Sequence, residues 1–366
     1  MVKRRAVGLK ESNSLAKQPQ TTIHAEPLKE NVNYFKPVTT TQERQYWDQL
    51  AVEVGQTGWT VDQIRPINST ENAATITIDV PGTCDYVDTK ATFLALTIKV
   101  TKEDGTAAAD NVYAPVQLFP HALFSQVDVK VGTSKISDSN PHYPYRAFAE
   151  TLYGPDPDVK NCLLKSSEIW IPLPPSKSGE TNAAADGASS EIKQRAAFIN
   201  GGIAYTTIVK LHADLFNLDR FLPPMTNFTV ELRRSPTTFA LMGAGDAPKP
   251  KITLSDVQLL VRRVKMLDSL RLQDESGLAR EPIRIFVPHK RVTDHAIQNG
   301  IGKYTASNFI TGEIPQRMTF MLVPDANLRG ATLDTNPFDF KPHAIESVKV
   351  KVNGESLAHG GGGDKD

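Results

Sequence analysis

A short stretch of the chain occurs twice, and both copies carry the alternation of a β-strand. Residues 120–132 read PHALFSQVDVKVG, and residues 342–354 read PHAIESVKVKVNG. In both, valines alternate with polar residues, which places the apolar side chains on one face of a strand. The Pro-His-Ala motif recurs after 222 residues and the valines recur after 221. We interpret this as duplication of one all-β unit in tandem, because a period of this length is too long for a solenoid.

The surroundings of the two copies support the duplication. An apolar run at 91–100 ends 21 positions before His121, and a similar run at 317–323 ends 20 positions before His343. In both places a turn-rich connection and an aromatic residue precede the motif. The two histidines therefore occupy equivalent positions, and we interpret them as structural residues at the start of a strand.

Strand patterns dominate the rest of the chain. Parallel sheets need a helical pattern between successive strands, and almost none is present here. Helical patterns occur only at 142–155, where Pro144 favours a helix start, and at 211–224. Long-looped all-β chains of this size most often form eight-stranded double-sheet rolls. The sequence thus predicts an all-β tandem (double) jelly roll with short helices in loops. The further strand-like segments are 74–80, 168–173, 204–211, 228–234, 257–266 and 283–288.

Composition divides the chain into five expected parts. Residues 1–60 are polar and aperiodic, which predicts an extended arm. A first roll is expected over 61–242, a Gly/Pro-rich linker at 243–251, a second roll over 252–357 and a flexible tail at 358–366. After its valine strand the first unit continues for roughly 100 residues, whereas the second continues for fewer than 15. We therefore expect the second roll to be incomplete, as a truncated copy or one whose missing strands a partner donates.

Charge and cysteine usage exclude several classes of protein. Lys plus Arg and Asp plus Glu both number 41, so the net charge is zero and specific nucleic-acid binding is not expected. The two cysteines, Cys84 and Cys162, exclude a disulfide framework and suit a reducing compartment. No run approaches the roughly 18 apolar residues of a membrane span, and no signal peptide is expected.

The residues also disfavour chemistry at the repeated motif. His121, Ser125 and Asp128 invite comparison with a Ser-His-Asp triad, but no G-x-S-x-G turn is present and Ser125 lies beside a regular strand. His289 and His295 are six apart, a weak spacing for a metal site. We therefore expect no enzyme, with no catalytic residue, no metal site and no cofactor.

Two basic or aromatic segments are candidates for a subunit interface, where aromatic residues and arginine are enriched. The helix at 142–155 presents Tyr145, Arg146 and Phe148. The strand at 257–266 carries Arg262 and Arg263, which alternation places on opposite faces. These five residues could equally pack within their own roll or remain solvated.

Five blocks of sequence resemble one family in the same order: LFPHALFSQVDVKVG (118–132), SNPHYPYRAFAETLYG (139–154), LHADLFNLDRFLPP (211–224), FTVELRRSPTTFALM (228–242) and VQLLVRRVKM (257–266). The chain resembles the double-jelly-roll, hexon-like major capsid proteins of Polinton/Maverick elements and adintovirus-like viruses, together with related uncharacterised animal proteins. The resemblance spans about residues 74–357. It departs where the family's last block, with a Gly-Asn-Gly turn and an aromatic strand, would complete the second roll.

The resemblance implies a structural capsid subunit. Three copies would form a pseudo-hexagonal capsomer of an icosahedral DNA virus or virus-like element. Its partners would be itself, neighbouring capsomers, and penton or minor capsid proteins. The protein would lie in the virion capsid after synthesis in the host cytoplasm, with the nucleus as a candidate site of assembly. A host-encoded, decayed or truncated relative of such a capsid gene and a jelly-roll carbohydrate-binding module remain the alternatives.

Overall fold

The computed structural model describes residues 55–71, 73–137, 140–307, 315–341, 343, 345–352 and 355–356. The chain divides into two units, Met1–Val54 and Gly55–Asp366, and everything below concerns the second. Most of the expected arm and all of the expected tail at 358–366 lie outside the described residues. The last five residues of the expected arm, 56–60, belong to the first strand.

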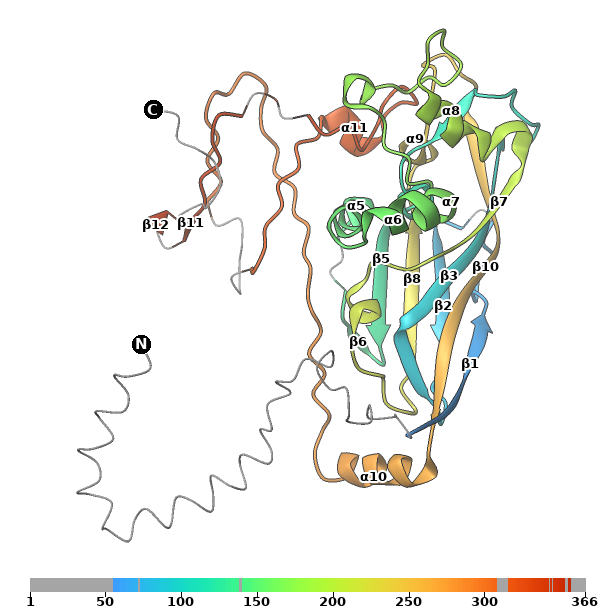
Figure 1. Ribbon diagram of the computed structural model, residues 1–366, viewed down its shortest axis with the longest axis vertical. Coiled ribbons are helices and arrows are strands. Elements are labelled where there is room, and N and C mark those ends of the chain that lie inside the picture. Colours follow the sequence, from blue (N-terminus) through green and yellow to red (C-terminus); the bar gives the residue numbers. More distant parts are fainter. Residues whose placement is uncertain are drawn as a thin grey trace, which may run out of the picture. The chain divides into compact units, whose positions relative to one another are not determined.

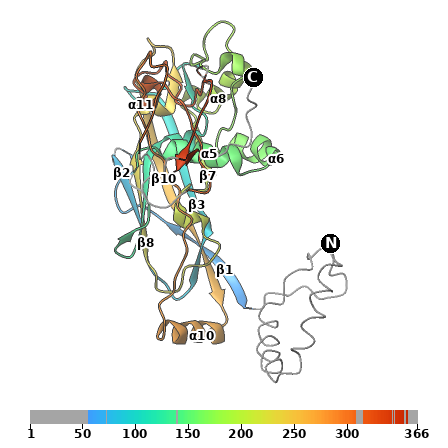
Figure 2. The ribbon, with the colours of Figure 1, turned by 90° about the vertical axis from the view of Figure 1, so that its left-hand side faces the viewer.

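Eight strands form two antiparallel four-stranded sheets, which lie beside one another in Figures 1 and 2. The first sheet has the order β1-β10-β3-β7, with β1 (Gln56–Ile64), β10 (Pro250–Met266), β3 (Tyr86–Lys102) and β7 (Ala204–Val209). The second has the order β2-β8-β5-β6, with β2 (Thr75–Val80), β8 (Phe228–Arg234), β5 (Phe124–Val131) and β6 (Ser134–Lys135). Lettered B to I along the chain, these sheets read B-I-D-G and C-H-E-F. That is the strand order of a jelly roll, so the all-β roll predicted from the sequence is confirmed.

The boundary between the expected rolls differs from the prediction. The segment at 257–266 was expected in the second roll, but it lies in β10, which pairs with both β1 and β3. Residues 243–251, expected as an interdomain linker, instead connect β9 (Leu241–Gly243) to the start of β10. Composition could not reveal this, because the last strand of a jelly roll returns to pair beside the first after a loop of any composition.

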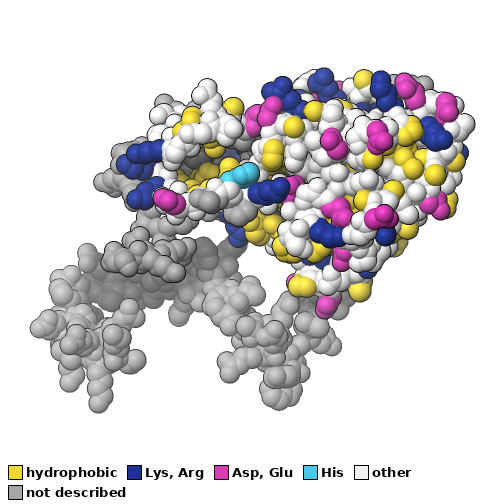
Figure 3. Space-filling view, turned by 90° about the horizontal axis from the view of Figure 1, so that it is seen from above, with side chains coloured by type: hydrophobic (Ala, Val, Ile, Leu, Met, Phe, Trp, Pro, Cys, Tyr) yellow, Lys and Arg dark blue, Asp and Glu magenta, His cyan; other side chains and the backbone are white. Residues whose placement is uncertain are grey.

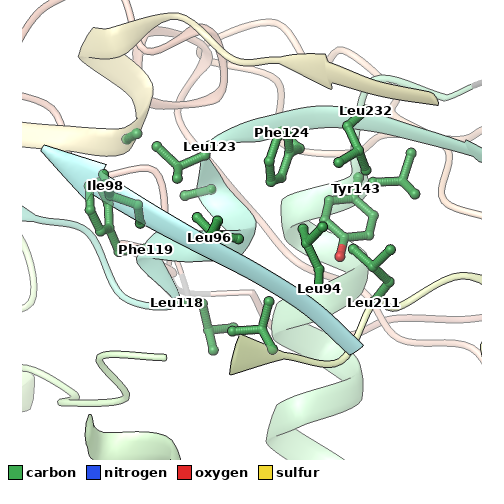
Figure 4. Packing of buried hydrophobic residues seen from close by; sticks show 14 of the residues in the cluster. Leu94, Leu96, Ile98, Leu118, Phe119, Leu123, Phe124, Tyr143, Leu211 and Leu232 are labelled. Carbon is green, nitrogen blue, oxygen red and sulfur yellow. The ribbon is translucent and has the colours of Figure 1, made fainter. Parts of the chain in front are cut away.

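The core fills the space between the two sheets. Ile76, Ile78 and Val80 alternate along β2 with their side chains fully buried. In Figure 4, Leu94, Leu96 and Ile98 of β3 face a group of buried side chains that includes Leu118, Phe119, Leu123, Phe124, Tyr143, Leu211 and Leu232. Each such buried side chain contributes about 1.5–3 kcal/mol relative to exposure. The period-2 alternation in the sequence thus decides which face of each strand enters the core.

Short helices and turns cover the ends of the roll. The predicted helix at 142–155 is confirmed as α5, with Pro144 in its first turn. The second predicted helix, at 211–224, contains only the 3-10 turn η5, and no strand forms at 168–173. The helices and turns are α4 (Phe119–Ala122), α5 (Tyr143–Tyr153), α6 (Pro157–Val159), η2 (Lys160–Leu164), α7 (Lys165–Ser167), η3 (Pro175–Lys177), α8 (Ser190–Ala197), η4 (Asn200–Gly202), η5 (Asp214–Asn217), α9 (Thr237–Ala240), α10 (Asp268–Leu278) and α11 (Asp325–Arg329). The short strand β4 (Tyr113–Pro115) pairs with β9.

Beyond α10 the chain has little regular structure (Figure 1). Among the described residues from 279 to 350 the only helix is α11 and no strand forms, although 283–288 and 317–323 carry strand patterns. The short hairpin of β11 (Lys351–Val352) and β12 (Glu355–Ser356) follows. A strand needs a paired neighbour, and Phe286 is 88% exposed. No closed second roll is present among these described residues, and the incompleteness of that roll stays a prediction.

None of the helices in the described part of the chain is long and apolar enough to cross a membrane.

Candidate functional site

The first histidine of the repeated motif lies in a buried polar cluster. His121 belongs to α4, directly before β5, and its side chain is fully buried. Its Nδ1 is 3.0 Å from the hydroxyl of Tyr143, and its Nε2 is 3.5 Å from Oε1 of Glu168. Burial raises the pKa of the Tyr143 hydroxyl, which therefore stays protonated. Burial also opposes ionisation of Glu168, but the imidazole of His121 outweighs it and lowers the pKa of this carboxyl.

A second histidine stands beside the first. The rings of His121 and His212 meet edge to face with their centroids 4.8 Å apart. The Nδ1 of His212 is 2.8 Å from Oε2 of Glu150, and its backbone N–H donates to the hydroxyl of Tyr143 at 3.3 Å. Burial lowers the pKa of His212 despite the opposing pull of the Glu150 carboxylate.

An ion-pair network extends from this cluster. Arg146 donates to Oε1 of Glu150 at 2.9 Å and to Oδ1 of Asp214 at 2.5 Å. Burial disfavours the charge of Arg146, but the two carboxylates outweigh it and raise its pKa. The same carboxylates reach the segment after α10, because Glu150 is 3.1 Å from Lys290 and Asp214 is 2.8 Å from His289. The network therefore ties that segment to the roll.

The triad that the sequence invites is not assembled. Ser125 donates to backbone carbonyls of β8 at 3.4 Å, while His121 faces Tyr143 and Glu168 instead. Asp128 pairs with Lys135 at 2.8 Å, on the outer face of the second sheet. His121 thus contacts Tyr143 and Glu168 at the entry to β5, and its structural role stays a prediction.

A small cavity adjoins the cluster. It measures about 30 Å³ and is lined by polar groups that include Tyr143, Arg146, His212 and Lys290. A volume of that size holds about one water molecule. Within the described residues, no group of three or more His, Cys, Asp or Glu side chains is placed to hold a metal ion. The polar cluster around His121 and His212 can therefore bind protons, and it can hold together the backbone segments that its side chains contact.

Sequence reasoning singled out only part of this network. It named Arg146 as an interface candidate, but not Glu150, Glu168, His212 or Asp214 as partners in one cluster. Glu150, Glu168 and the segment 212–214 lie far apart in the sequence, so no local spacing joins all of them. The one available signal was that acidic and histidine residues interrupt otherwise apolar blocks such as 211–216.

The aromatic candidates for a subunit interface are buried within the chain itself. Tyr145 is 4% exposed and Phe148 is 8% exposed. Both contact Phe338, at ring-centroid distances of 5.7 Å and 5.2 Å, and Phe340 completes the aromatic group. This cluster joins α5 to residues after α11. A role for these residues between subunits stays a prediction.

The two arginine candidates lie on opposite faces of β10, as alternation predicts. Arg263 is 2% exposed and donates to Asp62 at 3.0 Å. Arg262 points outward, with its guanidinium 5.2 Å from the ring centre of Trp59 and 3.4 Å from Asp88. Such cation–π contacts at exposed sites contribute about 0.5–1 kcal/mol. Of the two, only Arg262 is available to another molecule, and its interface role also stays a prediction.

The outer faces of the two sheets differ in chemistry. On the second sheet, polar and charged side chains pair across strands, as in Lys130–Glu231 at 2.5 Å and Asp128–Lys135. On the first sheet, large apolar side chains face outward beside Arg262. They are Trp59 (60% exposed), Val61 (46%), Phe93 (38%) and Ile208 (53%). We call this set the apolar face. The strand register places these side chains on the face opposite the core.

Charges of both signs are mixed on the surface seen in Figure 3. Lys and Arg side chains are scattered there among Asp and Glu, and no continuous basic track crosses that view. This distribution fits the zero net charge of the sequence.

No family model and no curated protein matches this sequence. Solved structures that it matches include viral capsid proteins. The PBCV-1 virus capsid model gives a TM-score of 0.38 and 8% identity, over 62% of this chain and 47% of that chain. The mavirus major capsid protein gives 0.34 and 10%, over 63% and 51%. The Sputnik virophage structure gives 0.39 and 10%, over 63% and 53%.

This chain thus spans about half the length of the solved structures that it matches. At such TM-scores and identities no residue role is transferred from them. The class of this protein is defined by its own strand order, which is that of a jelly roll.

Proposed function

We propose that this chain is a structural subunit of a viral or virus-like capsid, and that it acts by binding copies of itself. The assembly would be a homotrimer forming a pseudo-hexagonal capsomer of an icosahedral DNA virus or element. Neighbouring capsomers and penton or minor capsid proteins would be its further partners in the virion. The family resemblance of the five sequence blocks supports this proposal.

The observation that carries the proposal is the apolar face of the first sheet. Aromatic residues and arginine are enriched in protein interfaces, and tryptophan and arginine are among the residues that most often dominate the binding energy. Here Trp59, Phe93 and Arg262 are exposed on one sheet face, whereas the other sheet pairs its outward charges within the roll. A monomer that stayed alone in water would gain nothing from this arrangement. We assign the face to a second copy of this chain.

The mass of the purified 366-residue chain in solution tests the proposal. Size-exclusion chromatography with light scattering should give three times the chain's mass, and electron microscopy should show particles with pseudo-hexagonal outline. Replacing Trp59 and Phe93 by serine should shift the mass toward one chain, because the interface would lose its largest apolar side chains. Arg233→Ser, on the polar outer face, is the matched control and should leave the mass unchanged. A wild-type chain that stays monomeric at all concentrations would contradict the proposal.

A further inference from the structure

The two adjacent histidines form the centre of a closed set of titratable groups. The side chain of His121 is fully buried and that of His212 is 15% exposed. Their rings, 4.8 Å apart, are flanked by Glu168 on one side and Glu150 on the other. The hydroxyl of Tyr143 lies between them, in contact with the ring of one and the backbone N–H of the other. Two imidazoles therefore share one poorly hydrated space.

The backbone around this pair is strained. Leu118, directly before α4, has a φ of 56°, and so does Ile169, directly after Glu168. Neither residue is a glycine, and a left-handed conformation is especially unfavourable for a β-branched side chain such as that of Ile169. Strain of this kind persists only where the surrounding contacts impose it, and it is common in switch regions. Here the two strained residues adjoin the segments that carry His121 and Glu168, whose side chains face one another.

Two buried polar atoms, one in His121 and one in Glu168, have no hydrogen-bond partner. The Nε2 of His121 and the Oε2 of Glu168 are buried without a hydrogen bond. The Nε2 is 3.5 Å from Oε1 of the same carboxylate, which is an ion-pair distance once the ring is protonated. With His121 protonated, a second proton on His212 would place two imidazolium rings with their centroids 4.8 Å apart.

The histidine pair is connected to the segment that follows α10. Glu150, the partner of His212, also holds Arg146 and Lys290. Asn140 donates to the backbone carbonyl of Val292, which adds a contact along the same segment. A change in the charge of His212 therefore acts on the group that fastens residues 289–292 to the roll. We name residues 289–292 the strap.

We propose that His121 and His212 form a proton-operated lock, in which acidification forces a second proton into the buried pair and releases the strap from helix α5. The lock does not depend on the capsid role proposed above. It uses only groups within one chain, so it would operate in a monomer as well as in an assembly.

His212 determines whether acidification stabilises or destabilises the closed chain. Burial lowers the pKa of His212 below its ordinary value of 6.5, so the opened chain binds a proton there before the closed chain does. Stability is therefore lost as the pH falls below 6.5. A single such group raises the population of the opened state by up to about tenfold per pH unit. The pKa values of Glu150 and Glu168 are also lowered, so their contribution is lost only below about 4.5.

Other titratable groups near the strap oppose this trend or are neutral to it. His289 faces Asp214, and His142 faces Asp294 at 3.3 Å, so protonation of these two histidines strengthens their ion pairs. Lys210 is within electrostatic range of Glu150, and its pKa is lowered mainly by burial, but it keeps its charge throughout the acid range. Acid opening between pH 6.5 and 4.5 is therefore specific to the buried pair.

Hydrogen exchange of the full chain at several pH values tests the lock. After correction for the chemical exchange rate, amides in α5 and at 211–214 should lose up to about tenfold in protection from pH 6.5 to 5.5. Amides of β10 should keep their protection. His212→Gln removes the second proton and should flatten this dependence, whereas His343→Gln, an exposed histidine of the same repeated motif, should leave it unchanged.

Two results would overturn the lock. One is a His212→Gln chain that opens with the same steep pH dependence as the wild type. If that variant fails to fold, the wild-type chain gives the second measurement, because exchange at the imidazole C2 hydrogen reports the titration of each histidine. If the midpoint pH for protonation of His212 is equal to or above that of His343, burial does not oppose the protonation of His212.

Discussion

The two copies of the repeated motif have opposite environments in one molecule. In the first copy, Leu123 is 3% exposed, and β5 lies between β8 and β6. In the second, the equivalent Ile345 is 50% exposed and Val348 is 49% exposed. His343, unlike its buried counterpart, is exposed, with a left-handed φ of 46°. Nearly the same sequence is therefore a core strand in one place, whereas in the other residues 345–350 lie outside any strand and only Lys351–Val352 pair, in a short hairpin.

The difference teaches that alternation defines the faces of a strand but not its partner. The first copy pairs with β8, where Val129 stands opposite Val230. Among the described residues of the second copy no such partner strand is present, and only Lys351 and Val352 pair, with β12. The second copy has the pattern of a strand without that partner. Without a second sheet to cover them, the apolar side chains of the second copy remain exposed to water.

Truncating the equivalent leucine and isoleucine gives the largest contrast. Leu123→Ala should cost about 2–5 kcal/mol of unfolding free energy, because it removes buried methyl groups and leaves a cavity. Ile345→Ala should change it by no more than about 0.5 kcal/mol, because the side chain is half exposed. Urea unfolding followed by tryptophan fluorescence measures both. Equal losses in the two variants would show that the second copy is packed in solution, and the comparison would then fail.

The equivalent histidines give an intermediate contrast. His121→Ala should cost about 1–3 kcal/mol, because the hydroxyl of Tyr143 and the carboxylate of Glu168 lose their buried neighbour. His343→Ala should change the unfolding free energy by less than about 0.5 kcal/mol. Both are measured by urea unfolding at pH 7.5, above the range in which the buried pair takes up protons. A loss confined to His343→Ala would reverse the assignment of the two histidines.

The sequence was sufficient to predict the elements of the roll. Strands over 74–80, 91–100, 204–211 and 228–234 all form, because each combines alternation with a clear turn at its end. The helix at 142–155 forms because its apolar residues share one face behind a starting proline. These features depend on residues that are close together in the sequence, so the sequence pattern is enough to predict them.

Features that depend on distant contacts could not be predicted in the same way. The assignment of 257–266 to a second roll was wrong, because only pairing with β1 and β3 shows to which sheet a strand belongs. β1 itself was missed, since its alternation is weak and Trp59 and Val61 face outward. The polar cluster escaped notice for a similar reason. Its two carboxylates, two histidines and one tyrosine come close to one another only when the chain is folded.

The equivalent lysines give the smallest contrast. Lys130 is paired with Glu231 across β5 and β8, whereas Lys351, at the equivalent place in the second copy, lies in the short strand β11 outside either sheet of the roll. Exposed cross-strand ion pairs stabilise only weakly and are screened by salt. Lys130→Ala should therefore lower the urea midpoint slightly at low ionic strength and not at 1 M sodium chloride, where charges are screened within about 3 Å. Lys351→Ala should leave the midpoint unchanged in both conditions. A salt-dependent loss in Lys351→Ala would mean that this strand has found an acidic partner, which is the arrangement that a completed second roll would create.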